Sequence, residues 1–338
     1  MSEAGAPGAR NLLTDVPGLL VGQAEDERLG TGVTCVTGPD GLVAGVDLRG
    51  GAPGARELAL LDPAATVPSV DALVLTGGSA FGLEAASGVM AALAEGGRGF
   101  PVSGVTVPIV PAAVIFDLPT LAGGVPAEGE MARLGRAALA AAGETFALGS
   151  HGAGRGAREA RWKGGLGSAS ARLSCGGMIG ALVVVNAAGS TTYPGSRHFL
   201  AWPWEEGAEF GGLGPPETPP RRWQQSDGKP MPLGTSASEG GRTATTIGVI
   251  ATDIALDKAG AQRLAVAAQA GLARAIAPAH THRDGDLVFG VSTGRRSPAD
   301  RVELEHYAAT AMARAIARGV HAVTPRHGDR APSWAADR

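Results

Sequence analysis

Three uninterrupted apolar runs constrain the fold of this chain more than any other feature. They cover Ile179–Val185, Thr245–Thr252 and Leu287–Ser292. A strand that alternates apolar and polar residues buries one face, whereas a solidly apolar strand is typical of a sheet covered on both faces. The pattern therefore predicts layered sheets with helices outside them, in an α/β or α+β sandwich.

Helical patterns supply the covering layers. Apolar residues with helical spacing predict helices at about 80–93, 130–142, 258–276 and 297–318. Asp257 suits the N-cap of the third helix, and Ser297-Pro298 suits the start of the fourth. Near the N-terminus, we expect Val33–Val36 and Leu42–Leu48 to be two strands joined by the turn 38–41.

Composition excludes several classes of function. The 338 residues are 44% hydrophobic, enough for a packed core, and carry a net charge of -3 with both signs interspersed. This balance shows no basic face for nucleic acid. Cys35 and Cys175 lie far apart without a C-x-x-C, which argues against a disulfide framework and a zinc site. With no secretion signal and no run long enough to cross a membrane, we expect a cytoplasmic protein.

A long Gly/Pro/Ser-rich segment, at about 200–243, precedes the strand that begins at Thr245. It is too long for an ordinary connector, so we expect it to be functional or flexible; residues 1–10 and 323–338 are predicted to be frayed tails. A Thr that follows such a loop directly and is the first residue of a buried strand is well placed for self-cleavage of the chain. The freed Thr then acts as an N-terminal nucleophile with its own α-amine as base. Taken alone, Thr245 and Thr246 are also consistent with ordinary β-branched strand residues.

Other polar residues stand beside glycines or at strand ends. Lys163 lies in a glycine-rich stretch, either exposed or held against a closely approaching backbone. Asn186 ends an apolar run, as a strand-end cap or as an amide donor aimed at a developing oxyanion. Asp284 and Asp286 flank Gly285 ahead of a buried strand, as a surface turn or as carboxylates that reach a site at the sheet edge.

Two further motifs depart from known signatures. Gly77–Gly82 follows a strand and precedes a helix, but its spacing differs from both G-x-G-x-x-G and G-x-S-x-G. It is therefore a tight turn or a pocket wall that includes Gly78 and Ser79. His280 and His282 fit no zinc spacing, and we interpret them as loop histidines near a turn.

Eight segments in order along nearly the whole chain form one specific pattern. They are Leu13–Gly18, Asp47–Gly54, Leu73–Leu83, Val107–Leu118, Lys163–Ser170, Val184–Asn186, Thr245–Asp253 and Asp284–Asp286. In these segments the sequence resembles the L-aminopeptidase/D-esterase family, which includes β-aminopeptidases and endo-type 6-aminohexanoate-oligomer (nylon) hydrolases. The resemblance implies a four-layer αββα sandwich like that of N-terminal-nucleophile hydrolases. It also implies cleavage into an α chain, 1–244, and a β chain, 245–338, which together form one domain.

The resemblance assigns roles by position. The bond to be cut joins Ala244 and Thr245, and Thr245 is the nucleophile. The other residues implied in catalysis are Lys163, Asn186, Asp284 and Asp286. Phe116 stands where some members have an oxyanion-stabilising Tyr, so it is expected only to wall a substrate pocket with Gly78 and Ser79. The nylon-hydrolase branch has Asn before the nucleophile, where this chain has Ala244.

The implied mechanism needs no metal or organic cofactor. Thr245 Oγ attacks the Ala244 carbonyl, and hydrolysis of the resulting ester frees the α-amine, whose reference pKa of about 7.7–8.0 suits a general base. Lys163 would lower that pKa. Asp284 and Asp286 would orient Lys163 and the Thr, and Asn186 would donate to the oxyanion.

The implied partners are a small peptide or amide substrate and further copies of the αβ unit, in a homotetramer or larger assembly. Two alternatives remain open. One is an acyltransferase of the ornithine acetyltransferase type, which also splits an Ala-Thr bond. The other is an uncut, non-enzymatic binding protein.

Overall fold

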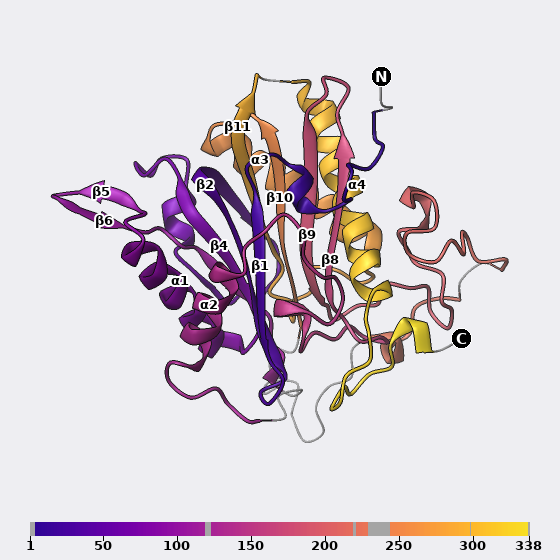
Figure 1. The fold of residues 1–338 in the computed structure, drawn as a ribbon. Coiled ribbons are helices and arrows are strands. Elements are labelled where there is room, and N and C mark those ends of the chain that lie inside the picture. The colour runs from indigo at the N-terminus through magenta and orange to yellow at the C-terminus, as the bar shows by residue number, and fades with distance from the viewer. Residues whose placement is uncertain (1–3, 119–122, 219–220, 229–243, 298, 337–338) are drawn as a thin grey trace.

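The chain folds into four layers, helix–sheet–sheet–helix, as the apolar strands predict (Figure 1). The computed structural model describes residues 4–118, 123–218, 221–228, 244–297 and 299–336. Within these ranges nine strands form one hydrogen-bonded sheet: eight follow the order β3-β7-β4-β2-β11-β10-β9-β8, and the ninth, β1, pairs with β2.

The first sheet layer is built from the N-terminal third of the chain. Its strands are β1 (Leu20–Asp26), the first part of β2 (Thr31–Leu48), β3 (Ala55–Arg56), β4 (Val70–Thr76) and β7 (Ala112–Val114). The helices α1 (Glu84–Glu95) and α2 (Glu130–Ala140) cover its outer face (Figure 1). A separate hairpin, β5 (Phe100–Val102) and β6 (Val105–Val107), projects beyond this layer.

The second sheet layer carries the apolar runs. Its strands are β8 (Leu166–Arg172), β9 (Met178–Asn186), β10 (Thr245–Ile254), β11 (Leu287–Arg296) and the second part of β2. Every residue of β9 and β10 is buried, because α3 (Lys258–Ala275) and α4 (Arg301–His321) cover one face and the first sheet covers the other. Asp257 caps α3 by accepting from Gly260 N, as predicted.

In the part of the chain that the structure describes, three apolar cores hold the four layers together. Leu73 and Leu75 of β4 meet Val184 of β9 and Val249 of β10 in the core between the sheets. Val74 and Val33 face the opposite way, toward α1 and α2, and a third core lies beneath α3 and α4. Short 3-10 turns complete the connections, at Leu13–Asp15, Leu58–Leu61, Ser79–Leu83, Gly152–Gly154, Trp202–Trp204, Gln225–Asp227 and Trp334–Ala336.

The predicted hairpin over residues 33–48 is wrong. These residues form one strand, β2, whose first part pairs with β1 and β4 and whose last part, Val43–Leu48, pairs with β11. The exposed residues Pro39–Gly41, predicted as a hairpin turn, instead mark the point where β2 passes from one sheet to the other. A local turn signal cannot distinguish a reversal of the chain from this kind of crossing.

The start of the last helix also differs from its prediction. α4 begins at Arg301, and Asp300 caps it by accepting from Val302 N and Glu303 N. Pro298, predicted as the first-turn residue, lies outside the described residues. Asp and Ser are both favoured N-caps, so local propensity leaves the choice between Ser297 and Asp300 to packing.

Several segments expected to be loose are anchored to the second sheet layer and its helices. Gly5 N donates to Arg172 O of β8, which holds the N-terminal segment. In the 200–243 segment, Phe210 is buried and Glu209 pairs with the buried Arg314 of α4. In the C-terminal tail, Trp334 is buried. Residues 1–3, 219–220, 229–243 and 337–338 of these segments lie outside the described residues.

None of the described helices combines the length and apolar character that a membrane span requires.

Candidate active site

Thr245 is the first residue of β10, and the antiparallel register places it directly opposite Asn186, the last residue of β9. Alternate residues of β10, Ile247 and Val249, lie in the core between the sheets, so Thr245 shares their face. Cross-strand partners share a face as well, so Asn186 projects to the same side. The Thr245 side chain is buried, and its Oγ1 donates a hydrogen bond to the carbonyl oxygen of Ala244.

The carbonyl of Ala244 has a second donor. Gly285 N–H donates to the Ala244 oxygen at 3.1 Å, and Ala244 pairs with Asp284 in a parallel bridge. The peptide bond before Thr245 is therefore held between the nucleophile candidate and the Asp284–Asp286 turn. The sequence is consistent with either a surface turn or carboxylates that reach a site at the sheet edge; in the structure both carboxylates are buried, and the turn lies against the peptide bond before Thr245.

Asp286 fixes the backbone that follows Thr245. Its Oδ1 accepts from Thr246 N at 2.7 Å, and its Oδ2 accepts from His280 N at 3.1 Å and lies 3.0 Å from His280 Nδ1. His280 has a φ of 56°, in the left-handed region that non-glycine residues rarely occupy. Its interpretation as an ordinary loop histidine was therefore incomplete. No sequence motif signals this role, because the contact depends on the path of the loop.

Asp284 lies beside Asp286 and is buried. Its Oδ1 accepts from Ala188 N at 3.0 Å, and its Oδ2 accepts from the backbone N–H of Thr281 at 2.8 Å and from the Thr281 hydroxyl. Burial, and then the nearby charge of Asp286, raise the pKa of Asp284 above its ordinary value. Both causes disfavour a second negative charge in a confined site.

Asn186 joins the two sheets at the site. Its Nδ2 donates to Phe116 O at 3.1 Å, and its Oδ1 accepts from Arg158 N at 3.1 Å. Phe116 is half-buried. The amide thus ties the segment after β7 to the end of β9, next to Thr245.

The predicted pocket residues Gly78 and Ser79 lie against the same segment. Gly78 N donates to Asp117 Oδ1 at 2.7 Å, and Ser79 N donates to Ile115 O at 3.1 Å. Asp117 is buried, and burial raises its pKa although Thr31 Oγ1 donates to it at 2.6 Å. Sequence reasoning missed Asp117, since only the fold shows that this carboxylate is buried.

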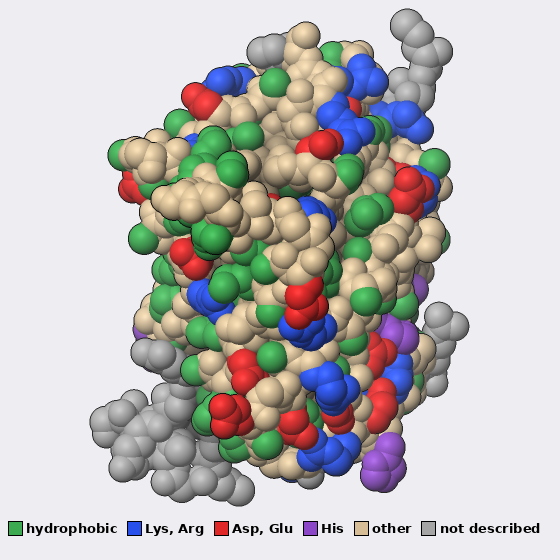
Figure 2. All heavy atoms as spheres, turned by 60° about the vertical axis from the view of Figure 1, so that its left-hand side comes forward, with side chains coloured by type: hydrophobic (Ala, Val, Ile, Leu, Met, Phe, Trp, Pro, Cys, Tyr) green, Lys and Arg blue, Asp and Glu red, His purple; other side chains and the backbone are tan. Residues whose placement is uncertain are grey.

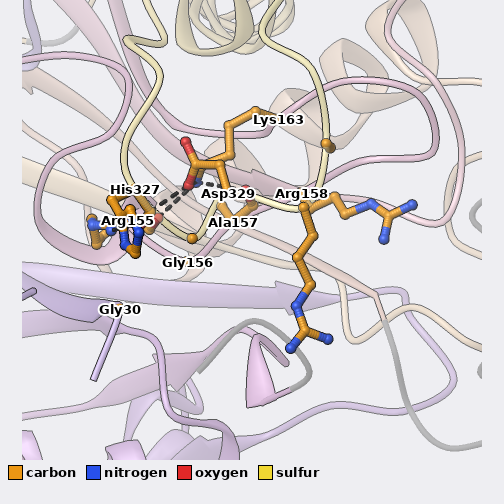
Figure 3. Close-up of a pocket in the computed structure, with 11 residues that line it drawn as sticks. Gly30, Arg155, Gly156, Ala157, Arg158, Lys163, His327 and Asp329 are labelled. Atoms are coloured by element: carbon orange, nitrogen blue, oxygen red, sulfur yellow. Dashed lines mark hydrogen bonds and ion pairs between the residues drawn. The ribbon is translucent and has the colours of Figure 1, made fainter. Parts of the chain in front are cut away.

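Lys163 lies in a pocket that is also lined by residues 155–158 and by residues 327–331 of the C-terminal tail (Figure 3). Its Nζ donates to Arg155 O at 2.6 Å, to Ala157 O at 3.0 Å and to Gly154 O at 3.5 Å. The carboxylate beside it is Asp329 of the C-terminal tail, at 3.8 Å. Burial is the main cause that lowers the pKa of Lys163 from 10.5 to about 8.

The structure therefore brings together Thr245, Asn186, Asp284 and Asp286 with the Ala244 carbonyl. The described contacts of the Lys163 ammonium join it to Asp329 and to backbone carbonyls, and none of them joins it to Asp284 or Asp286. Pairing of these two Asp residues with Lys163, as expected from the sequence, thus differs from the arrangement found. Within the described ranges, no group of three or more His, Cys, Asp or Glu side chains is placed to hold a metal ion.

Comparison with known proteins assigns the chain to a family. The model of peptidase family S58 matches residues 11–331. An uncharacterised aminopeptidase of Mycobacterium tuberculosis is 48% identical over 84% of this chain and 82% of its own length. A 6-aminohexanoate-oligomer endohydrolase of Kocuria sp. is 31% identical over 85% of this chain and 76% of its own.

Solved structures show the same architecture. A β-aminopeptidase of Burkholderia sp. superposes with a TM-score of 0.68 at 23% identity, over 98% of this chain and 93% of that one. The L-aminopeptidase D-Ala-esterase/amidase of Ochrobactrum anthropi, described as a variant of the Ntn hydrolase fold, superposes with a TM-score of 0.64 at 18% identity, over the same shares of the two chains. The αββα sandwich predicted from the sequence is thus confirmed, and the chain belongs to peptidase family S58.

Proposed function

We propose that this chain is a self-processing amide hydrolase in which Thr245 is the N-terminal nucleophile. One observation carries the proposal: the Thr245 hydroxyl is hydrogen-bonded to the carbonyl of the peptide bond that precedes it. A nucleophile must be held close to the carbonyl that it attacks. Here that carbonyl belongs to the chain itself.

Self-cleavage proceeds by an N-to-O shift followed by hydrolysis. Thr245 Oγ attacks the carbonyl carbon of Ala244, the C–N bond breaks, and the hydroxyl proton ends on the departing nitrogen. Water then hydrolyses the Ala244 ester. The products are an α chain, 1–244, with a new carboxylate, and a β chain, 245–338, with a free α-amine. The side chain of Ala244 takes no part in these steps, so the absence of Asn at this position is compatible with processing.

The mature enzyme uses the same atoms on an external amide. The free amine of Thr245, with a reference pKa of about 7.7–8.0, accepts the Oγ proton as Oγ attacks the substrate carbonyl. An acyl-Thr ester forms, the substrate amine departs with the proton, and water releases the acid. Asp286 holds the backbone of Thr246 at 2.7 Å, which fixes the strand that carries the nucleophile.

Lys163 acts as a positioning residue in this proposal. Its ammonium holds the carbonyls of Arg155 and Ala157, and the next N–H of that turn, at Arg158, donates to Asn186 opposite Thr245. The resemblance in sequence implies that Lys163 acts directly on the Thr245 α-amine by lowering its pKa. In this proposal it acts instead through this chain of contacts to Asn186. Loss of Lys163 should then affect turnover through the placement of Asn186.

The proposed substrates are small peptides and amides, cleaved by an aminopeptidase or by a hydrolase of polyamide oligomers such as those of 6-aminohexanoate. The similarity to aminopeptidases and to a 6-aminohexanoate-oligomer endohydrolase supports this class. The Ala244-Thr245 bond keeps an acyltransferase as a second candidate. Acetyl transfer from acetylornithine to glutamate, assayed beside hydrolysis of aminoacyl anilides, separates the two activities.

The decisive experiment is a denaturing gel with intact-mass measurement. Wild type is expected to give two chains, 1–244 and 245–338, and Thr245→Ser is expected to do the same. Thr245→Ala should remain a single chain without hydrolase activity. Thr246→Ala is the matched control, since its side chain lies on the opposite face of β10, and it should still be cut. An intact wild-type chain that hydrolyses amides would contradict the proposal.

The αβ units are proposed to assemble into a homotetramer or larger oligomer. Support comes from the β5–β6 hairpin, whose register pairs Phe100 with Val107 and Val102 with Val105, so that these four apolar residues share one face. All four are exposed, and hydrophobic side chains gather in the upper left of Figure 2, where the hairpin projects. An exposed apolar patch of this kind is typical of an interface.

Sedimentation velocity tests the assembly. Val102→Asp with Val105→Asp should lower the molecular mass of the particle. Val302→Asp, at an exposed apolar residue on α4, is the control and should not. An unchanged mass in the hairpin variant would show that the units associate through another surface.

A further inference from the structure

We infer that the backbone N–H of Gly285 is the oxyanion donor of this enzyme, first for the Ala244 carbonyl during self-cleavage and then for the substrate carbonyl. The inference rests on the proposed function. It assigns a role to the residue between the two predicted Asp residues, which the sequence singled out only for their carboxylates.

The Gly285 N–H already donates a hydrogen bond to the carbonyl oxygen of the bond to be cut. Gly285 N is 3.1 Å from Ala244 O in the uncut chain. The Thr245 hydroxyl donates to the same oxygen, but it must give up that bond when Oγ turns to attack the carbonyl carbon. The Gly285 N–H then remains to stabilise the negative charge that develops on oxygen as the Oγ–C bond forms.

The N–H is held rigidly from both sides. The carbonyl of Asp284 accepts from Ala52 N at 2.8 Å, and the carbonyl of Asp286 accepts from Arg49 N at 2.9 Å. The two carboxylates are buried and accept from backbone groups of Ala188 and Thr246. A donor fixed in this way needs no reorganisation when charge appears, which is the condition for effective electrostatic stabilisation.

Glycine is required at this position by the space around the nucleophile. A Cβ at 285 would lie 2.9 Å from Thr245 Oγ1 and 2.6 Å from Ala52 O. Its φ lies outside the left-handed region, so the constraint is contact and not backbone strain. Gly285 therefore lets its backbone approach the reacting group closely, which a side chain would prevent.

The same donor serves the second reaction because the nucleophile does not change. After cleavage the Ala244 carbonyl becomes part of a carboxylate at the free end of the α chain. In this inference, a substrate carbonyl attacked by Thr245 Oγ places its oxygen where the Ala244 oxygen lay, within reach of Gly285 N–H. Asn186 Nδ2, the donor expected from the sequence, bonds to Phe116 O, whereas Gly285 N–H points at the reacting carbonyl.

Replacement of the Gly285 amide by an ester tests the inference, because it removes the N–H without adding atoms to the site. An α-hydroxy acid introduced at position 285 should slow self-cleavage about 100- to 1,000-fold, the range for loss of one oxyanion donor. In material that has been cut, kcat on an aminoacyl anilide should fall by a similar factor with little change in KM. The matched control is the same ester at Gly294, whose N–H donates to Ser292 Oγ away from the site.

A second measurement uses the wild-type enzyme, in case the ester variant does not fold. A crystal structure of the cut protein with a peptidyl boronate on Thr245 should place a boronate oxygen within hydrogen-bond distance of Gly285 N. An oxygen held only by Asn186, or an ester variant that cuts itself as fast as wild type, would overturn the inference while leaving the Thr245 proposal intact. A wild-type chain that is never cut would instead overturn the proposed function.

Discussion

Lys163 and Asp329 lie 3.8 Å apart, and this contact ties the C-terminal tail to the turn at residues 155–158 that supports Asn186. Arg155 Nη1 also contacts Asp329, at 3.2 Å. The tail in turn accepts from the backbone of Lys163, through Pro332 O at 2.8 Å. Residues that become separate chains after the proposed cleavage are therefore joined through a buried charge cluster.

The first prediction concerns the pH dependence of this cluster. Burial lowers the pKa of Lys163 from 10.5 to about 8 in the folded chain. Between about pH 8 and 10.5 the unfolded chain therefore keeps the Lys163 proton while the folded chain has lost it. The free energy of unfolding consequently rises as the pH increases from about 8, and this gain is lost again as the pH falls back through about 8. The contribution approaches about 1.4 kcal/mol per pH unit in that window.

Denaturant unfolding between pH 7 and 10 measures this slope. Lys163→Met should remove the Lys163 contribution to it. Asp329→Asn should lower the pH at which stability begins to rise, because the Asp329 charge raises the pKa of Lys163 in the folded chain. An unchanged slope in Lys163→Met would mean that the lysine keeps an ordinary pKa.

The second prediction concerns Asp284. Both of its oxygens accept hydrogen bonds, and Thr281 N–H and Ala188 N–H cannot reverse their direction. Asp284→Asn must turn an NH2 group toward one of these donors, so we expect a loss of about 1–3 kcal/mol in unfolding free energy. Relief of repulsion from Asp286 offsets only part of this loss.

Thermal or urea unfolding measures the loss, and self-cleavage should slow in the same variant because the Gly285 turn is displaced. Asp40→Asn, at a largely exposed carboxylate, should leave stability within about 0.5 kcal/mol. Equal stability of the two variants would show that Asp284 is not held as described.

The third prediction concerns His280, whose Nδ1 lies 3.0 Å from Asp286. His280→Ala should slow self-cleavage about 10-fold, which corresponds to about 1.4 kcal/mol in activation free energy. Without the imidazole, the Asp286 carboxylate that accepts from Thr246 N is less restricted in its orientation. His280→Asn should restore most of the rate, since Asn places a donor near the same position and tolerates a positive φ. His282→Ala, at an exposed residue, is the control. A single-turnover time course of cleavage separates these variants, and equal rates for His280→Ala and wild type would remove His280 from the site.

The fourth prediction concerns the C-terminal tail. Trp334 stacks on Phe199 with ring centroids 5.4 Å apart, and its Nε1 donates to Arg197 O at 2.9 Å. Trp334→Ala should cost about 3–5 kcal/mol of unfolding free energy through the cavity left in the core beneath α4. Trp223→Ala, at a half-exposed Trp, should cost far less. Similar melting temperatures for the two variants would show that the tail is not part of the core.

The predicted elements failed where a residue has two locally acceptable roles. Pro39–Gly41 reads as a hairpin turn in a short window, but β2 continues because its second part finds a partner in β11, some 240 residues later. Ser297 and Asp300 are both good N-caps, and only the position of α4 on the second sheet selects Asp300. Phe210 lies in a Gly/Pro-rich segment, and its burial depends on contact with Phe199 and on Glu209 reaching Arg314.

By itself, the sequence determined the layered architecture and the position of the proposed nucleophile. Solidly apolar strands must be covered on both faces, whatever their order in the sheet, and a Thr at the start of such a strand is recognisable from its immediate neighbours. Only the tertiary structure decided which groups surround that Thr. Gly285 lies on the Ala244 carbonyl, Asp117 is buried against Gly78, and Asp329 lies beside Lys163 because packing brings together residues about 40 to 170 positions apart. Periodicity, capping and turn propensity act within a few residues, so they carry no information about contacts at that separation.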